Sequence, residues 1–300
     1  IAGESGCGKS ALCKSIMKLL PKTAKIKSGK ILVNGVDITD YTEKNMSRLR
    51  GELFSMVFQD PMTSLNPTIT VGKQIGEAVR IHNKKMSRGQ IRKRVIELMQ
   101  LVEIDRPEER IRQYPHEFSG GMRQRAVMAI ALAGNPKILF ADEPTTALDV
   151  TIQAQILDVF RRIQKKLEMA TVFISHDLGV VAGVADRVAV MYAGKIVEIG
   201  TAEEIFYDPR HPYTWGLLQS LPVLSEGKEW LPTLPGMPPT LIHPPKGDAF
   251  AERNVYAMRI DYEKEPPMFR ITDTHYAATW LLDERAPKVK VPTGGRRDGK

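Results

Sequence analysis

The chain has 300 residues, 42% of them hydrophobic, which suits one large domain with an appendage or two modest domains, each able to form a packed core. Lys and Arg outnumber Asp and Glu by 43 to 35, and the net charge of +8 fits an anionic partner such as a nucleotide, a nucleic acid or a lipid headgroup, or only a surplus for solubility. The two cysteines, Cys7 and Cys13, exclude a disulfide framework and indicate a reducing compartment. No apolar run is long enough to predict a transmembrane helix.

The first part of the chain alternates short apolar runs with helical segments. The predicted elements are a helix over 9–20, a strand over 30–35 that runs into a turn, a buried strand over 53–58, and a helical region over 71–113 with a turn at 105–107. From Arg80 to Arg94 there are seven basic residues and no acidic one. Because no aromatic residues that would stack on bases are interleaved with them, we interpret this segment as a solvated helix face.

Helices and strands continue to alternate beyond residue 120. The predicted elements are a helix over 121–133 that stops at 134–136, a strand over 138–141, a helix over 151–167, a strand over 171–174, a helix over 178–185, and a hairpin of strands 187–192 and 195–198. The strand over 138–141 is fully apolar, as a parallel sheet covered on both faces requires. The sequence therefore predicts an α/β fold with parallel strands.

The composition changes near Asp208. Between Pro209 and Pro245 there are nine prolines in 37 residues, which predicts an extended segment with turns instead of a core. Residues 246–285 mix aromatic and charged side chains and predict a small packed appendage. Residues 286–300 are rich in Pro, Gly, Lys and Arg and predict a frayed tail.

A phosphate-binding pattern, G-x-x-x-x-G-K-[ST], occupies Gly3-Glu4-Ser5-Gly6-Cys7-Gly8-Lys9-Ser10. The glycines let backbone N–H groups converge on a β-phosphate, Lys9 reaches the β- and γ-oxygens, and the Ser10 hydroxyl binds Mg²⁺. We favour a passive filler role for Cys7 over a reactive thiol, and a packing role for Cys13. Such a loop normally follows a buried strand, and only Ile1-Ala2 precede it here, so we expect an N-terminal truncation.

Polar residues follow three predicted strands, at the edge where parallel sheets collect their ligands. Asp142 would hold the Mg²⁺ shell, and Glu143 would polarise the attacking water as general base. Gln59 would touch Mg²⁺ or that water and sense occupancy. His176, as a neutral imidazole, would hydrogen-bond a γ-phosphate. Each of these residues alone is more often structural, and the upstream phosphate loop favours the catalytic interpretation.

Ser119-Gly120-Gly121 opens the helix predicted over 121–133. Its free N–H groups and the positive helix end predict an anion site, although a Gly-Gly turn is also a common cap. Because Lys9 already serves one phosphate site in its own subunit, we expect this second loop to contact the γ-phosphate held by a partner subunit.

Taken together, the motifs resemble the ATPase subunit of ATP-binding cassette (ABC) transporters. The resemblance runs from residue 1 to about 207 and rests on the phosphate loop, Gln59, Ser119-Gly120-Gly121, Asp142-Glu143, Ala147-Leu148-Asp149 and His176. The stretches 58–67, 118–125 and 142–150 are similar to the oligopeptide/dipeptide permease branch, and Met122 looks like its D-type subunit. His211-Pro212-Tyr213-Thr214 and the proline-rich stretch resemble that branch's C-terminal extension.

The resemblance implies a P-loop NTPase fold in three parts. These are an ABC ATPase domain over 1–207 with a RecA-like core, a truncated N-terminal β-subdomain and a helical insert over about 68–135, then an extension over 208–285 and a flexible tail over 286–300. It implies an ATPase that energises import of oligopeptides or dipeptides, with ATP and Mg²⁺ as cofactors. The implied nucleotide contacts are Gly3, Glu4, Ser5, Gly6, Cys7, Gly8, Lys9, Ser10, Gln59, Ser119, Gly120, Gly121, Asp149 and His176. Glu143, His176 and Gln59 are the implied catalytic residues, and Ser10, Gln59 and Asp142 the implied metal ligands.

The implied partners are a second, unlike ATPase subunit packed head to tail, two transmembrane permease subunits that dock near Gln59 and the segment 68–118, and, indirectly, an extracellular peptide-binding protein. Asp149 would signal across the ATPase interface. The implied location is the cytoplasmic face of the plasma membrane, as a peripheral protein, with no nucleic acid bound. The cargo stays open between oligopeptides, dipeptides and, as the alternative, a metal chelate such as nickel.

Many members of the family carry four cysteines in the tail that bind an iron–sulfur cluster. The corresponding residues here are Asp248, Asn254, Asp261 and Thr279, and because none offers a thiolate we expect no cluster. A hard-cation site at Asp248 and Asp261 is the weaker alternative.

Two other classes of cassette ATPase fit less well. A chromosome-maintenance or DNA-repair cassette would insert long coiled coils between the phosphate loop and the signature, but Ser119 follows Lys9 by only 110 residues. A translation-factor cassette would carry two signatures, and the sequence has one.

Overall fold

The computed structural model describes residues 1–146, 148–221 and 234–290, apart from the side chains of residues 61 and 62. Predictions for Ala147, for 222–233 and for the end of the tail lie outside the described residues. The chain forms two compact units. The terminal unit joins Ile1–Lys9 to Ser175–Lys300, and the central unit is Ser10–Ile174.

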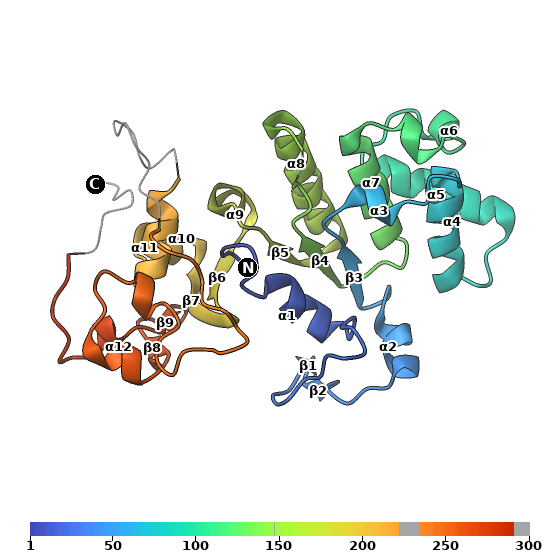
Figure 1. Cartoon of the computed structure of the whole chain (residues 1–300). Helices are drawn as coiled ribbons and strands as arrows, with labels where there is room; N and C mark the ends of the chain where they lie inside the picture. The colour runs from blue at the N-terminus through green and yellow to red at the C-terminus, as the bar shows by residue number, and fades with distance from the viewer. Residues whose placement is uncertain (147, 222–233, 291–300) are drawn as a thin grey trace. The chain divides into compact units, whose positions relative to one another are not determined.

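The central unit contains a three-stranded parallel sheet and most of the helices (Figure 1). Its elements are α1 (Lys9–Ile16), β1 (Leu32–Val33), β2 (Val36–Asp37), α2 (Glu43–Leu49), β3 (Phe54–Val57), α3 (Pro61–Ser64), α4 (Val71–His82), α5 (Arg88–Leu101), α6 (Pro107–Arg110), the 3₁₀ turn η1 (Pro115–Glu117), α7 (Gly120–Ala131), β4 (Ile138–Asp142), α8 (Val150–Leu167) and β5 (Ala170–Ile174). The predicted α/β fold with parallel strands is confirmed.

The sheet has the order β3-β4-β5, with β4 in the middle. Phe54 pairs with Ile138, and Ile138 pairs with Ala170, so the three strands end at one common edge. The amphipathic helix α8 covers the sheet, and its Phe160 ring packs edge-on against Phe173 of β5 with centroids 5.8 Å apart. Asp142 is the last residue of β4 and Gln59 follows the end of β3, so both lie at this common edge.

Helices α4, α5 and α7 pack against one another, and α7 also packs against β3. The helical region predicted over 71–113 therefore exists, with two breaks. At the first break, Ser87 and Gln90 form a reciprocal capping box that starts α5. At the second, Arg106 has φ +48° and Pro107 begins α6, in agreement with the predicted turn at 105–107.

Two predictions for the first 40 residues need correction. The helix predicted over 9–20 ends at Ile16, because Lys18 turns left-handed at φ +52° and the Leu19 N–H bonds back to the Lys14 carbonyl oxygen at 2.8 Å. The strand that was predicted to run into a turn over 30–35 exists as the shorter β1, and the predicted turn lies at Asn34 and Gly35, both with positive φ; the pairing of β1 with β2 in a hairpin was not predicted.

The terminal unit is built on a four-stranded antiparallel sheet with the order β6-β7-β9-β8. Its elements are α9 (Leu178–Val184), β6 (Arg187–Tyr192), β7 (Lys195–Thr201), α10 (Ala202–Tyr207), α11 (Pro212–Gln219), η3 (Ala251–Arg253), α12 (Arg259–Glu263), β8 (Phe269–Arg270), β9 (Tyr276–Ala277) and η4 (Trp280–Leu282). The predicted hairpin of β6 and β7 is confirmed, although β7 is longer than expected.

The proline-rich segment after residue 209 differs from its prediction, because it contains the helix α11. Pro212 stands at the first helical position, where its missing N–H costs nothing. Tyr213, Trp215 and Leu218 are buried, so this segment contributes to a hydrophobic core, whereas the sequence analysis predicted an extended segment outside any core. The packed region over 246–285 also joins the main sheet, since β9 pairs with β7. None of the helices in the described ranges is both long and apolar enough to span a bilayer.

Candidate active site

The phosphate loop in the terminal unit turns at three glycines with positive φ, namely Gly3 at 149°, Gly6 at 81° and Gly8 at 101°. At Gly3 a Cβ atom would lie 2.1 Å from the Met191 carbonyl oxygen, so only glycine fits there. Cys7 is buried, and its carbonyl oxygen accepts a hydrogen bond from the Gly194 N–H at 2.9 Å. The loop is thus shaped by its close contact with the turn after β6.

The Lys9 side chain folds back over this loop and is 4% exposed. Its ammonium group donates to the carbonyl oxygens of Gly3 and Glu4, both at 2.8 Å. The positive charge is therefore held within the loop, where the sequence pattern predicts that phosphate oxygens bind.

Ser10 and Asp142 meet in the central unit, as predicted for two metal ligands. The Ser10 hydroxyl donates to Asp142 Oδ1 at 2.6 Å, although 132 residues separate the two. Asp142 ends the middle strand β4 and is 2% exposed. A hydroxyl and a buried carboxylate are the hard oxygen donors that Mg²⁺ prefers, so the pair fits this ion.

Glu143 and Gln59 also meet, at the ends of β4 and β3. Glu143 Oε2 accepts hydrogen bonds from Gln59 Nε2 at 3.1 Å and from the Thr146 hydroxyl at 3.0 Å. The Glu143 backbone has φ +46°, a conformation that costs energy for a residue with a Cβ and is often found at functional sites. Thr146 was missed by the sequence analysis, although its spacing of three residues from Glu143 was a usable signal.

The signature and Asp149 lie at the starts of two neighbouring helices. Ser119 caps α7 by accepting from the Met122 N–H at 3.3 Å, and Asp149 caps α8 by accepting from the Ile152 N–H at 3.0 Å. A Cβ added to Gly121 would lie 2.7 Å from Ile152, which shows how closely α7 and α8 approach. The other N–H groups in a helix's first turn have no partner within the helix, as the predicted anion site requires.

His176 belongs to the terminal unit, where it follows Ser175 and is exposed. Its neighbour Asp177 caps α9 by accepting from the Gly179 N–H at 2.8 Å. The predicted site residues thus fall into two groups. The phosphate loop up to Lys9 and His176 lie in the terminal unit, and Ser10, Gln59, the signature, Asp142, Glu143 and Asp149 lie in the central unit.

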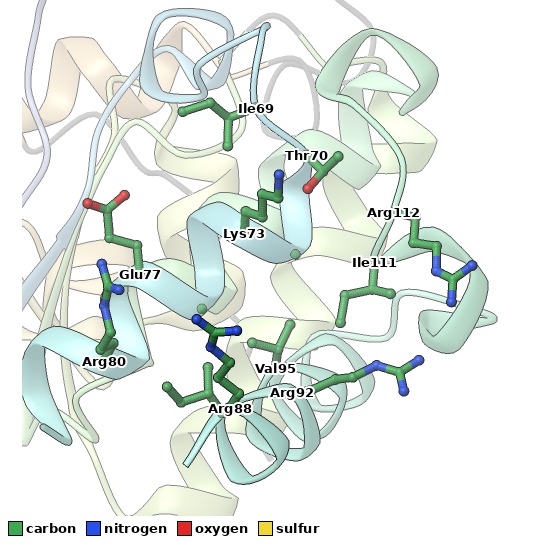
Figure 2. Close-up of a pocket in the computed structure, with 13 residues that line it drawn as sticks. Ile69, Thr70, Lys73, Glu77, Arg80, Arg88, Arg92, Val95, Ile111 and Arg112 are labelled. Carbon is green, nitrogen blue, oxygen red and sulfur yellow. The ribbon is translucent and has the colours of Figure 1, made fainter. Parts of the chain in front are cut away.

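A hollow of about 660 Å³ lies between α4 and α5 in the central unit (Figure 2). Five basic residues and one acidic residue contribute to its lining, namely Lys73, Arg80, Arg88, Arg92 and Arg112 with Glu77. Apolar side chains from Ile91, Val95 and Ile111 also line it. The basic segment predicted to be a solvated face thus contributes to a concave surface suited to an acidic or amphipathic partner segment.

The four positions considered for an iron–sulfur cluster carry buried oxygen acceptors. Each of them accepts a hydrogen bond from a nearby backbone N–H group. Asp248 accepts from Phe250 at 3.0 Å, and Asn254 accepts from Tyr256 at 3.0 Å. Asp261 accepts from Met258 at 2.7 Å, and Thr279 accepts from Leu281 at 3.3 Å. These side chains stabilise turns and do not fit a cluster that needs thiolates. Over the described residues, no three His, Cys, Asp or Glu side chains gather in a way that would hold a metal ion.

Two residues of the C-terminal region contact the phosphate loop, and the sequence analysis missed both. The Tyr213 hydroxyl accepts from the Glu4 N–H at 2.9 Å, and the Arg253 guanidinium binds the Glu4 carboxylate at 2.7 Å. No local pattern signals either contact, because each joins residues more than 200 positions apart.

Two family models match parts of the chain. Residues 1–146 match the ABC transporter family, and residues 197–260 match the C-terminal region of oligopeptide/dipeptide transporters. The chain is 61% identical over 294 residues to the oligopeptide transport ATP-binding protein OppD of Bacillus subtilis (97% of this chain, 82% of that protein). It is 58% identical over 289 residues to the dipeptide transport ATP-binding protein DppD of Lactococcus lactis (96% and 83%).

Two solved structures are similar to the chain. The ATP-binding cassette MJ0796, described as dimeric and bound to ADP and Pi, aligns with a TM-score of 0.58 at 26% identity, covering 67% of this chain and 83% of that one. The structure of cbiO1 from Clostridium perfringens, part of an ABC transporter complex, aligns with a TM-score of 0.61 at 31% identity, covering 68% and 77%.

Proposed function

This chain belongs to the ABC transporter ATP-binding proteins of the oligopeptide/dipeptide branch, and on that premise we propose which of its residues bind and hydrolyse ATP. It is an ATPase subunit that energises a peptide importer, and it works with membrane permease subunits. The observation that carries the residue assignment is the Ser10–Asp142 hydrogen bond, because it joins the phosphate loop's terminal residue to the carboxylate at the end of β4.

We propose that residues Gly3 to Ser10 bind the phosphates of ATP through backbone N–H groups and the Lys9 ammonium. Ser10 and Asp142 would hold Mg²⁺, with Gln59 as a further ligand. When bound, that ion neutralises charge on the phosphate oxygens. No iron–sulfur cluster is assigned to the C-terminal region, and its absence stays a prediction.

Glu143 is the proposed general base. Its Oε2 accepts hydrogen bonds from Gln59 and Thr146, which fixes the direction of the carboxylate that would take a proton from water. Gln59 would report on the occupied site because it contacts Glu143 directly. His176 would donate a hydrogen bond to the γ-phosphate.

Ser119, Gly120, Gly121 and Asp149 are proposed to act on the nucleotide of a second ATPase subunit, in a heterodimer with two composite sites. ATP would close the pair because the closed state binds it more tightly. Two permease subunits would dock on the central unit, with the basic hollow between α4 and α5 as the proposed receptor. A peptide-binding protein outside the cell would deliver cargo, and the chain would lie peripherally at the cytoplasmic face of the plasma membrane without binding nucleic acid.

Gly120 provides a sharp test of the composite site. A Cβ there would lie 3.5 Å from Leu148, an ordinary contact, so Gly120→Ala fits within one subunit and the Cβ of Gly120→Asp meets no clash. We expect Gly120→Asp to reduce ATP hydrolysis by the assembled transporter by about 100-fold, because the new carboxylate would face a γ-phosphate. The matched control is Gly120→Ala, which adds the Cβ atom at the same position without the charge. Equal hydrolysis by both variants would refute the composite site.

A further inference from the structure

Glu4, the second residue of the phosphate loop, is held at both its backbone and its side chain by the C-terminal region of the terminal unit. Its N–H donates to the Tyr213 hydroxyl at 2.9 Å. Its carboxylate accepts a two-pronged pair of hydrogen bonds from Arg253, Nη1 to Oε2 at 2.7 Å and Nη2 to Oε1 at 2.9 Å. Paired bonds of this kind fix orientation as well as distance.

Arg253 is itself fixed by a buried aromatic cluster. The residue is 6% exposed, and its Nε donates to the Pro235 carbonyl oxygen at 2.8 Å. The guanidinium lies 5.6 Å from the Tyr192 ring centroid and 5.9 Å from that of Phe250. Tyr213 packs against the same two rings, with centroids 4.6 and 5.4 Å away. Both groups that hold Glu4 are therefore set in one rigid core.

The loop that they hold is costly to order. Its glycines at residues 3, 6 and 8 have positive φ, and glycine loses the most backbone freedom when its conformation is fixed. Glu4 is also where the lysine is anchored, because the Glu4 carbonyl oxygen accepts from Lys9 at 2.8 Å. Holding Glu4 therefore holds both the loop backbone and the ammonium that would meet a phosphate.

The Glu4 carboxylate would repel a nearby triphosphate if it were unpaired. The pairing with Arg253 neutralises this charge, and the same hydrogen bond raises the pKa of Arg253, so the guanidinium stays charged at every physiological pH. The C-terminal region thus orders the phosphate loop and neutralises its carboxylate, although more than 200 residues separate the two in sequence.

We propose that Arg253 and Tyr213 are positioning residues that hold the phosphate loop in the shape that binds nucleotide. The inference rests on the proposed role of residues 3–10 in binding phosphate. A loop ordered before binding loses less entropy when the ligand arrives, so the contribution falls on nucleotide affinity and not on the chemical step.

The test is equilibrium binding of ATP and ADP together with hydrolysis rates, on the full chain in its transporter complex. We expect Arg253→Met and Glu4→Gln each to raise the Kd of both nucleotides about tenfold, with kcat at saturating ATP changed less than about twofold. The double variant should resemble either single one, because the two residues act as a pair. Arg253→Lys keeps the charge but cannot form the paired hydrogen bonds, so its Kd values should lie between those of the parent and those of Arg253→Met. Tyr213→Phe should weaken binding in the same manner.

Arg285→Met is the matched control, because Arg285 pairs with Asp283 on the exposed surface of the same unit. Thermal unfolding of each variant shows whether a change in Kd comes from the loop or from loss of the fold. If Arg253→Met unfolds, the Kd values can still be measured with Glu4→Gln and Arg253→Lys. Unchanged Kd values in folded variants, or a fall in kcat with Kd unchanged, would overturn the inference. Lys9→Ala distinguishes its failure from failure of the proposed function: normal ATP binding by that variant would refute the loop's assignment itself.

Discussion

Carboxylates occur in two regions of this chain with opposite surroundings. At the ends of β3 and β4, Asp142 and Glu143 accept hydrogen bonds from side chains, Ser10 for one and Gln59 and Thr146 for the other. In the terminal unit, Asp248 and Asp261 accept from backbone N–H groups of their own turns. Side-chain donors move aside for a ligand at low cost, whereas a backbone donor is lost only when the turn is lost. The same residue type is therefore suited to binding a ligand in one region and stabilises turns in the other.

Glu198 shows the structural role in its extreme form. It is fully buried and accepts from the backbone N–H groups of Arg210 and His211, at 2.5 and 3.1 Å. Its Oε1 also lies 2.8 Å from Nε2 of His275, which is equally buried. One carboxylate thus joins β7, the start of α11 and the segment before β9.

The largest expected effect is at the strand ends. Glu143→Gln should reduce ATP hydrolysis by about 10²- to 10⁴-fold, because the amide cannot take a proton from water, while ATP binding is retained. Phosphate release and ATP titration on the assembled transporter measure the two quantities separately. Glu203→Gln, at an exposed position of α10 in the terminal unit, is the control. Hydrolysis at the parent rate would remove Glu143 from the role of base.

A smaller effect, of a different kind, is expected at Glu198. Glu198→Gln should lower the free energy of unfolding by about 2–4 kcal/mol, since it weakens a buried network whose partners have no water to replace it. Denaturant unfolding measures this loss, and kcat per folded molecule should not change. Glu263→Gln, in an exposed pair with Arg259, should cost less than about 1 kcal/mol. If Glu198→Gln left stability intact but abolished hydrolysis, the contrast between the two regions would fail.

The smallest effect concerns the pH dependence of stability. Burial raises the pKa of Asp248 to about 6, so its stabilising contribution is complete below its ordinary value near 3.8 and is lost as the pH rises towards 6. Asp248→Asn should therefore be more stable than the parent above pH 6, by about 1–3 kcal/mol, and equal to it near pH 3.5.

Burial also lowers the pKa of His211 to about 3, so its contribution is complete above pH 6.5 and is lost as the pH falls. This loss is common to the parent and to Asp248→Asn, and it cancels in their difference. Urea unfolding at pH 4 and pH 7.5 measures that difference, with the exposed Asp158→Asn as control. A constant difference across this range would show that Asp248 is ionised in the fold without penalty.

Much of the candidate site follows from patterns that are continuous in the sequence. The phosphate loop, the apolar strand ending at Asp142-Glu143 and the signature before α7 are each recognisable within ten residues, because turns, strands and helix caps depend on local hydrogen bonds and side-chain periodicity. The parallel sheet was predictable for the same reason. The helix α11 was not, because the high proline content of its segment argued against it, and its burial against the β6–β7 hairpin core, which includes Tyr192, depends on the tertiary fold.

By itself, then, the sequence determined the family and the order of the main elements, and it predicted the site residues, since all three are written in short motifs. The tertiary structure alone decided which of them touch: Ser10 with Asp142, Glu143 with Gln59, and Glu4 with Arg253 across 249 positions. Such contacts depend on how segments that are distant in sequence pack together, and local hydrogen bonds and side-chain periodicity carry no information about that packing.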